Sequence, residues 1–243
     1  MNALADNGYT RAWAAIGSSI PKPKAVLCIS AHWYIPDVAV TAMNMPQTIH
    51  DFGGFPQELF DVQYPAAGSP ELAERVSELL GGVRLDTTEW GLDHGTWSVL
   101  CHVFPDADVP VVQLSIDMTR PGEWHYEFAK NLKPLRDEGV LVCGSGNIVH
   151  NLRAFSWGNE TRGPYDWAVR FETEAKRLME SGDHASLANY ESMDTDAMLS
   201  VPTPEHFLPL LYVLAQQTDG ECVSFPVDGI DGGSISMLSV TVS

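Results

Sequence analysis

Three continuous apolar segments constrain the fold of this chain more than any other feature. They cover residues 25–30 (A-V-L-C-I-S), 109–116 (V-P-V-V-Q-L-S-I) and 140–145 (V-L-V-C-G-S). Unbroken runs of this kind, rich in β-branched residues, are typical of strands that are buried on both faces, and such strands belong to parallel or mixed sheets. The sequence therefore predicts a sheet that needs helices on both of its faces.

Helical segments lie between these strands. Ser69 as N-cap, Pro70 at the first helical position and the pair Gly81 and Gly82 beyond the apolar stripe predict a helix over residues 69–80. Residues 124–136 and 165–180 predict two more. The alternation of strands and helices indicates the α/β class, as a single domain over residues 1–243 with a central, mostly parallel or mixed sheet flanked by helices.

Charge and hydropathy exclude several classes of protein. The 14 basic and 32 acidic side chains give a net charge of −18, which repels nucleic acid and anionic lipid. The longest apolar run, from Phe207 to Ala215, is broken by Pro209 and is too short to span a membrane. The first residues lack the pattern of a signal peptide. We expect a cytoplasmic protein with neither nucleic-acid nor membrane partners, and the sequence does not indicate its oligomeric state.

The four cysteines are far apart and form no C-x-x-C pair. They are expected to be small core residues and not disulfide or zinc-knuckle partners. Other motifs are absent: Gly144-Ser145-Gly146 lacks the leading glycine of a nucleophile elbow, and Val149 stands where a dinucleotide fingerprint has its third glycine.

Five of the eight histidines lie at a strand end, in a loop or at a helix start, where a scaffold directs side chains into a cleft. Each alone is more often structural, but together they indicate a metal site, because neutral imidazoles bind divalent metals and relay protons near neutral pH. These five are His32, His50, His94, His150 and His206. The other three, His102, His125 and His184, are expected to be surface or hydrogen-bonded structural residues.

The segment Thr203-Pro204-Glu205-His206 predicts a helix start. Thr203 is expected to cap a helix that runs to Ala215, with Pro204 at its first position and Glu205 and His206 in its first turn. Glu205 is then a candidate for the carboxylate of a two-histidine, one-carboxylate iron site. Alternatively, Glu205 only complements the helix dipole.

The whole sequence resembles the DOPA 4,5-dioxygenase type of class III extradiol ring-cleaving dioxygenases, relatives of protocatechuate 4,5-dioxygenase. Five blocks in the same order carry the resemblance: S-A-H-W from Ser30, T-I-H-D-F-G-G-F-P from Thr48, W-G-L-D-H-G-T-W from Trp90, G-S-G-N-I-V-H-N-L from Gly144 and P-T-P-E-H-F from Pro202. The resemblance implies a single α/β domain and non-haem Fe(II), with Zn(II) in some relatives. It also implies a catechol substrate, such as DOPA or caffeate, that O2 opens to a muconic semialdehyde.

The resemblance also implies roles for individual residues. His32 and His206 would be metal ligands. His94 would be the acid/base residue that faces dioxygen and the substrate hydroxyl. His150 would be either a further ligand or a catalytic group bonded to the catecholate, and His50, Phe52 and Phe55 would line the substrate pocket.

One departure from the family pattern weakens these expectations. The family has a strand ending in G-H-G-S-P before the position of Met1, and its histidine is the first metal ligand. We expect that this N-terminal strand is missing because the polypeptide starts too late, and that the 243-residue form is poorly active. Two alternatives stay open: a zinc-binding protein of the same fold without dioxygenase activity, and a catechol-binding protein with a crippled site.

Overall fold

The computed structural model describes residues 2–159 and 162–243. The chain divides into two compact units. The first consists of Met1–Thr119 and Asn131–Ser145, and the second of Arg120–Lys130 and Gly146–Ser243. The first unit holds the main sheet, and the second holds a group of helices with two small antiparallel strand pairs.

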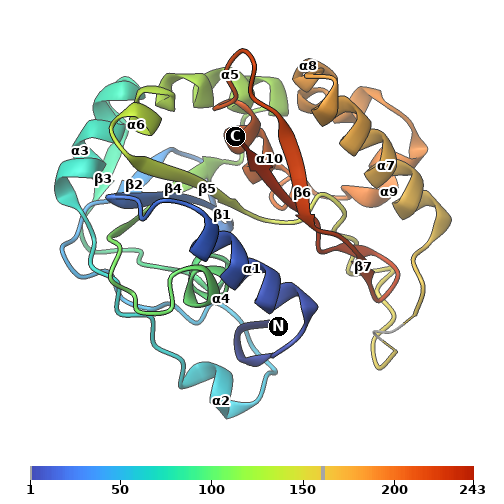
Figure 1. Ribbon diagram of the computed structural model, residues 1–243, viewed down its shortest axis with the longest axis horizontal. Helices are drawn as coiled ribbons and strands as arrows, with labels where there is room; N and C mark the ends of the chain where they lie inside the picture. Colours follow the sequence, from blue (N-terminus) through green and yellow to red (C-terminus); the bar gives the residue numbers. More distant parts are fainter. Residues whose placement is uncertain (1, 160–161) are drawn as a thin grey trace. The chain divides into compact units, whose positions relative to one another are not determined.

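A five-stranded sheet forms the centre of the first unit (Figure 1). β1 pairs in parallel with β4 and β5, β2 pairs in parallel with β3, and β2 and β4 are antiparallel. All of β4 and the first seven residues of β1 are buried. The α/β class and the mixed, mostly parallel sheet are thus confirmed. In sheet order the strands are β3 (Arg84–Asp86), β2 (Ala39–Thr41), β4 (Val111–Asp117), β1 (Ala25–Ile35) and β5 (Val140–Ser145).

Helices cover both faces of this sheet. Figure 1 shows α1 (Gly8–Ser19) and α4 (His94–Val103) on one face, and α3 (Pro70–Leu79) and α6 (Pro134–Asp137) on the other. α4 packs on β1, α3 on β2, α6 on β5, and α1 on α4. The shorter elements η1 (Asn2–Leu4) and α2 (Gln57–Phe60) complete the unit.

The helix predicted after Ser69 forms as its sequence dictates. The Ser69 side chain accepts a hydrogen bond from the Leu72 N–H, which satisfies one of the free donors at the start of α3. Leu72 and Val76 are buried. Gly81 follows the C-cap with φ 82°, a left-handed conformation that favours glycine.

The second unit consists of short helices around the long helix α7. α7 packs on α8, α9 and β6, and α5 packs on α8 and α10. The predicted helix over residues 165–180 is confirmed as α7, which begins after Tyr165. The elements are α5 (Gly122–Ala129), α7 (Asp166–Glu180), α8 (His184–Ala188), η3 (Tyr190–Ser192), α9 (Thr195–Ser200), α10 (Leu208–Leu214), β6 (Val223–Val227) paired with β9 (Ser239–Val242), and β7 (Ile230–Asp231) paired with β8 (Ile235–Ser236).

Two predicted helices are wrong in their extent, each because of a proline. The segment 124–136 is interrupted: α5 ends at Ala129, η2 (Lys130–Leu132) follows, and α6 starts at Pro134, which cannot continue a helix because it has no N–H.

The helix expected from Pro204 begins only at Leu208. The N–H groups of Phe207 and Leu208 both bond the Pro204 carbonyl, so these residues form a turn, and Pro209 lies in the first helical turn. A helix that started at Pro204 would have placed Pro209 in its interior, where it removes a backbone hydrogen bond.

The cysteines are free thiols. Cys28 is fully buried and opposes Cys143 in the β1–β5 pairing, and both pack in the core with Cys101. Burial raises the pKa of the Cys101 thiol to about 11. The expectation of core cysteines is wrong for Cys222, which is exposed. Among the described residues, no helix combines the length and the apolar character needed to cross a membrane.

Candidate functional site

A buried hydrogen-bond network fixes the start of α4 against the sheet. Asp93 is the N-cap of α4, and its Oδ1 accepts from the Thr96 N–H at 3.0 Å and from Ser30 Oγ of β1 at 2.7 Å. Its Oδ2 accepts from the side-chain amide of Gln113 in β4. Asp93, Gln113, Ser30 and Thr96 are fully buried. The first residue of α4, His94, is therefore held at a defined place against the sheet.

His32 lies where the sheet pairing of β1 is interrupted. The strand does not end at Ser30, as the sequence predicted, but continues to Ile35. Its pairing with β5 stops at Ser30, and its register with β4 shifts between Ile29 and Tyr34. Such irregularities bend a strand and redirect its side chains. His32 is 25% exposed between two buried neighbours, so it is accessible to a ligand at this break.

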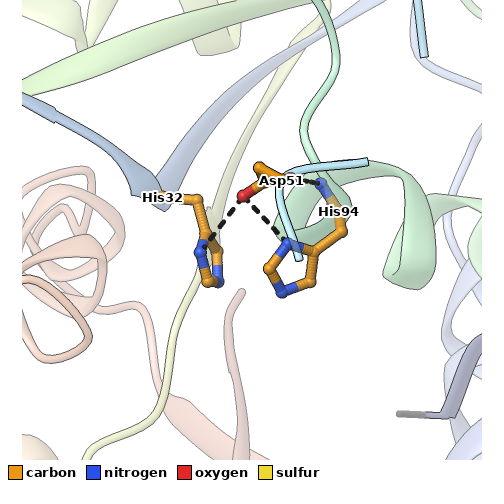
Figure 2. A group of neighbouring side chains, drawn as sticks. All are labelled: His32, Asp51 and His94. Atoms are coloured by element: carbon orange, nitrogen blue, oxygen red, sulfur yellow. Dashed lines mark hydrogen bonds and ion pairs between the residues drawn. The ribbon is translucent and has the colours of Figure 1, made fainter. Parts of the chain in front are cut away.

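The carboxylate of Asp51 brings His32 and His94 together (Figure 2). Asp51 Oδ2 lies 2.9 Å from Nδ1 of His94 and 3.4 Å from Nδ1 of His32, and Asp51 Oδ1 accepts from the His94 N–H at 2.9 Å. The contact with the His94 ring has the distance of a hydrogen bond but not its direction, so it acts as an electrostatic contact. The centroids of the two imidazoles are 3.8 Å apart.

The Asp51 carboxylate is held in its charged form. Burial raises the pKa of Asp51. The interactions with the side chain and N–H of His94 and the charge of His32 lower this pKa by more than burial raises it, so it lies below its usual value. A carboxylate that stays charged at this place can face a cation.

Aromatic side chains pack beside the cluster of His32, Asp51 and His94. The Phe52 ring meets the His94 ring edge-on at 5.4 Å and also contacts Phe55 at 5.5 Å. His50 packs on Phe52 at 5.8 Å and on Trp97 at 5.5 Å. Nε2 of His50 lies 2.9 Å from the Val62 carbonyl. Phe52 therefore lies next to His94, His50 packs behind Phe52, and Phe55 is 40% exposed.

The second unit holds its own histidine pair. The rings of His150 and His206 stack with centroids 3.5 Å apart and planes 8° from parallel. Asn147 holds His206 at two points, through its backbone N–H to the His206 carbonyl at 2.9 Å and through Oδ1, 3.2 Å from Nδ1. Gly146 lies so close to the His206 backbone that a Cβ would be 2.2 Å from its carbonyl oxygen. Both predicted ligands of this unit are thus in contact.

The structure groups the predicted site residues within each unit: His32, His50, Phe52, Phe55 and His94 in the first, and His150 and His206 in the second. The other three histidines make structural contacts, as predicted. His102 Nε2 faces the Asn2 carbonyl, His125 Nδ1 faces the Tyr212 hydroxyl, and His184 Nδ1 faces the Tyr126 hydroxyl. Glu205, the candidate carboxylate, accepts a hydrogen bond from Thr203.

Sequence reasoning missed two residues, Asp51 and Asn147. Asp51 stands between His50 and Phe52 in a glycine-rich loop, and an acidic residue in such an aromatic setting is the one signal that could have pointed to it. Asn147 gave no signal beyond its place after a strand.

The residues of the first unit suit a divalent metal ion. His32, Asp51 and His94 each offer one ligand atom, and these atoms lie within 4.8 Å of one another. Two imidazoles and a carboxylate are the donor types of non-haem iron sites, and imidazoles also suit zinc. The fold and the site thus define an α/β protein with a cluster of two histidines and one aspartate that could bind a metal ion.

The chain belongs to the family described as "Catalytic LigB subunit of aromatic ring-opening dioxygenase", whose model matches residues 5–226. An Escherichia coli (strain K12) protein named 4,5-DOPA dioxygenase extradiol is 50% identical over 247 residues, covering this whole chain and 90% of the relative. A Beta vulgaris protein of the same name is 37% identical, covering 88% of this chain and 81% of the relative. The crystal structure of an uncharacterized Escherichia coli K12 protein superposes with a TM-score of 0.85 at 45% identity, covering 98% of this chain and 93% of that one. The family confirms the resemblance seen in the motifs and makes the chain an aromatic ring-opening dioxygenase.

Proposed function

We propose that this protein opens the ring of a catechol such as DOPA or caffeate with O2 in an extradiol position, which gives a muconic semialdehyde. One observation carries the proposal. In a chain of the ring-opening dioxygenase family, His32 and His94 both face the Asp51 carboxylate, and the aromatic ring of Phe52 contacts His94. Relatives named 4,5-DOPA dioxygenase support the choice of substrate.

We propose Fe(II) as the metal, held by His32 and His206, with His150 as a further ligand or as a group that bonds the catecholate. The imidazole donors suit Fe(II) and Zn(II) alike. When bound, the metal supplies a common site at which catechol and dioxygen are oriented and exchange electron density. The stacked contact of His150 and His206 means that a change in one ring alters the surroundings of the other.

His94 is proposed to move protons. A neutral imidazole whose Nδ1 faces Asp51 has its lone pair on Nε2, which takes the proton of a catechol hydroxyl and returns it when the ring opens. His50, Phe52 and Phe55 are proposed to hold the catechol ring. The Phe52 ring is already in contact with His94 and can place an aromatic substrate against it.

The first test is oxygen uptake with DOPA and with caffeate after anaerobic loading with Fe(II). We expect catechol-dependent uptake of one O2 per semialdehyde formed with iron, and none with Zn(II). Catechol binding without oxygen uptake would identify a binding protein, and stoichiometric zinc that iron cannot replace would identify a zinc protein. Either result would reject the proposed iron-dependent opening of these catechols.

Single histidine variants test the residue roles. His32→Ala and His206→Ala are expected to lose bound metal, measured by elemental analysis of the folded proteins. His94→Ala is expected to keep metal and catechol affinity but lose turnover by a factor of about 100 to 10,000, the usual contribution of a general acid or base. His102→Ala, on the same helix as His94, is the matched control and should keep its metal, its catechol affinity and its turnover. Metal loss in His94→Ala would make this residue a ligand.

A further inference from the structure

Asp51 uses both of its carboxylate oxygens on the two histidines of the first unit. Oδ1 accepts the backbone N–H of His94, and Oδ2 faces Nδ1 of both His94 and His32. Asp51 is 17% exposed, so little water competes for these contacts. One side chain in the loop before α2 thus contacts both the first residue of α4 and the middle of β1.

The charge of this carboxylate favours one tautomer of both rings. Even without the direction of a hydrogen bond at His94, an Nδ1 that lies 2.9 to 3.4 Å from a charged oxygen is better placed with its proton there, because a lone pair in the same place would be repelled. Each neutral ring then has its lone pair on Nε2. Figure 2 shows that the second nitrogen of each ring points away from Asp51.

We propose that Asp51 is a positioning residue, which orients His32 and His94 and holds both in the tautomer with the proton on Nδ1. This assignment rests on the proposed function, in which Nε2 of His32 binds the metal and Nε2 of His94 accepts the catechol proton. Carboxylates behind a metal-bound histidine fix the ring in this way, and their loss lowers metal affinity by about 10- to 100-fold.

Asparagine at position 51 cannot do the same work. It has nearly the same shape but only one acceptor, whereas the aspartate has one acceptor for the His94 N–H and another for the two rings. If the amide oxygen keeps the backbone N–H, the NH2 group faces the rings and favours a lone pair on Nδ1. The proton then moves to Nε2, where it blocks metal binding and proton transfer.

The test compares Asp51→Asn with wild type and with Asp61→Asn, a control that changes an exposed carboxylate in the same region of the chain. Long-range proton–nitrogen NMR spectra of the zinc-free proteins at alkaline pH report which nitrogen of each imidazole carries the proton. We expect Nδ1–H for His32 and His94 in wild type and in Asp61→Asn, and Nε2–H for at least one of them in Asp51→Asn. Zn(II) affinity, from competition with a chelating dye, should fall by about 10- to 100-fold in Asp51→Asn only.

With the iron-loaded protein, kcat for the catechol should fall by about 100-fold or more in Asp51→Asn, while KM stays within about threefold. Asp51→Glu, which keeps the charge, should recover part of the lost kcat and Zn(II) affinity. The tautomer and zinc measurements need no turnover, so they test Asp51 even if neither DOPA nor caffeate is a substrate.

Unchanged tautomers with unchanged Zn(II) affinity in a folded Asp51→Asn protein would overturn the proposal. So would complete loss of Zn(II) binding with both rings still protonated on Nδ1, because that result would make Asp51 a direct ligand.

Discussion

Gly95 lies so close to its neighbours that no side chain, not even a single Cβ atom, fits at this position. A Cβ there would lie 2.5 Å from Ser30 Oγ and 2.8 Å from Cδ2 of His32. We predict that Gly95→Ala displaces the His32 ring, lowers the free energy of unfolding by about 1–3 kcal/mol, as overpacking does, and weakens Zn(II) binding. Urea unfolding and a zinc titration measure the two effects.

Gly8→Ala is the matched control, because a Cβ at that residue has no atom within 4 Å and lies at the start of α1. It should leave both quantities unchanged or raise stability slightly. Wild-type zinc affinity in Gly95→Ala would show that the His32 ring does not need its present position.

Individual residues of the candidate site were predictable only where a metal-binding or catalytic type of side chain lies at the end of a strand or at the start of a helix. The imidazoles of His32 and His94 lie at a strand and at a helix start, so both residues were candidates from the sequence alone. Their contact through Asp51 was not predictable, because it depends on a loop, a helix start and a strand meeting in space, which no local pattern encodes. The extension of β1 past His32 was missed for the same reason, since it depends on pairing with β4.

Among the elements, α4 has a cap of a different kind from α3. The Ser69 cap of α3 makes one hydrogen bond at a partly exposed helix end, and its loss should cost about 1 kcal/mol. The Asp93 cap of α4 accepts from the Thr96 N–H, from Ser30 Oγ and from the Gln113 amide in a fully buried place. Removing it leaves buried donors unsatisfied, at about 1–3 kcal/mol each.

We therefore predict that Asp93→Ala lowers the free energy of unfolding by at least about 3 kcal/mol, well beyond Ser69→Ala, in chemical denaturation of the two variants side by side. Metal binding should also weaken in Asp93→Ala alone, since α4 begins with His94. Equal destabilisation by the two variants would show that the buried network adds nothing to the cap.

Elements with a complete local pattern were predictable from the sequence. The helix after Ser69 and the bounds of the strand over residues 140–145 agree with the structure, because a helix cap, an apolar stripe and an unbroken apolar run all act within a few residues. The burial on both faces expected for that strand is wrong, since β5 is an edge strand of the sheet and is only partly buried. Helices near Pro134 and Pro209 were placed wrongly, because a proline fits either inside a first turn or at a break, and packing decides between them.

For the whole molecule, a net charge of −18 means that the folded chain repels itself. Most ion pairs in the described part of the chain are exposed, such as Arg11 with Asp6 and Arg177 with Glu174, and contribute little. We predict that raising NaCl from low concentration to about the physiological level increases the urea midpoint, because screening weakens the long-range repulsion more than it weakens these pairs. A midpoint that falls with salt would show that the ion pairs outweigh the net charge.

The hydrogen bond from Ser30 to Asp93 has a thermodynamic consequence for ligand binding. His32 is two residues from Ser30 and His94 is next to Asp93, so a short path of covalent bonds and one buried hydrogen bond of 2.7 Å joins the two imidazoles. Freezing a mobile side chain on binding costs about 1 kcal/mol of conformational entropy. Here much of that entropy is already lost when the first unit folds, so a metal ion at His32 and a catechol at His94 each meet a preorganised ring and bind it with little further ordering.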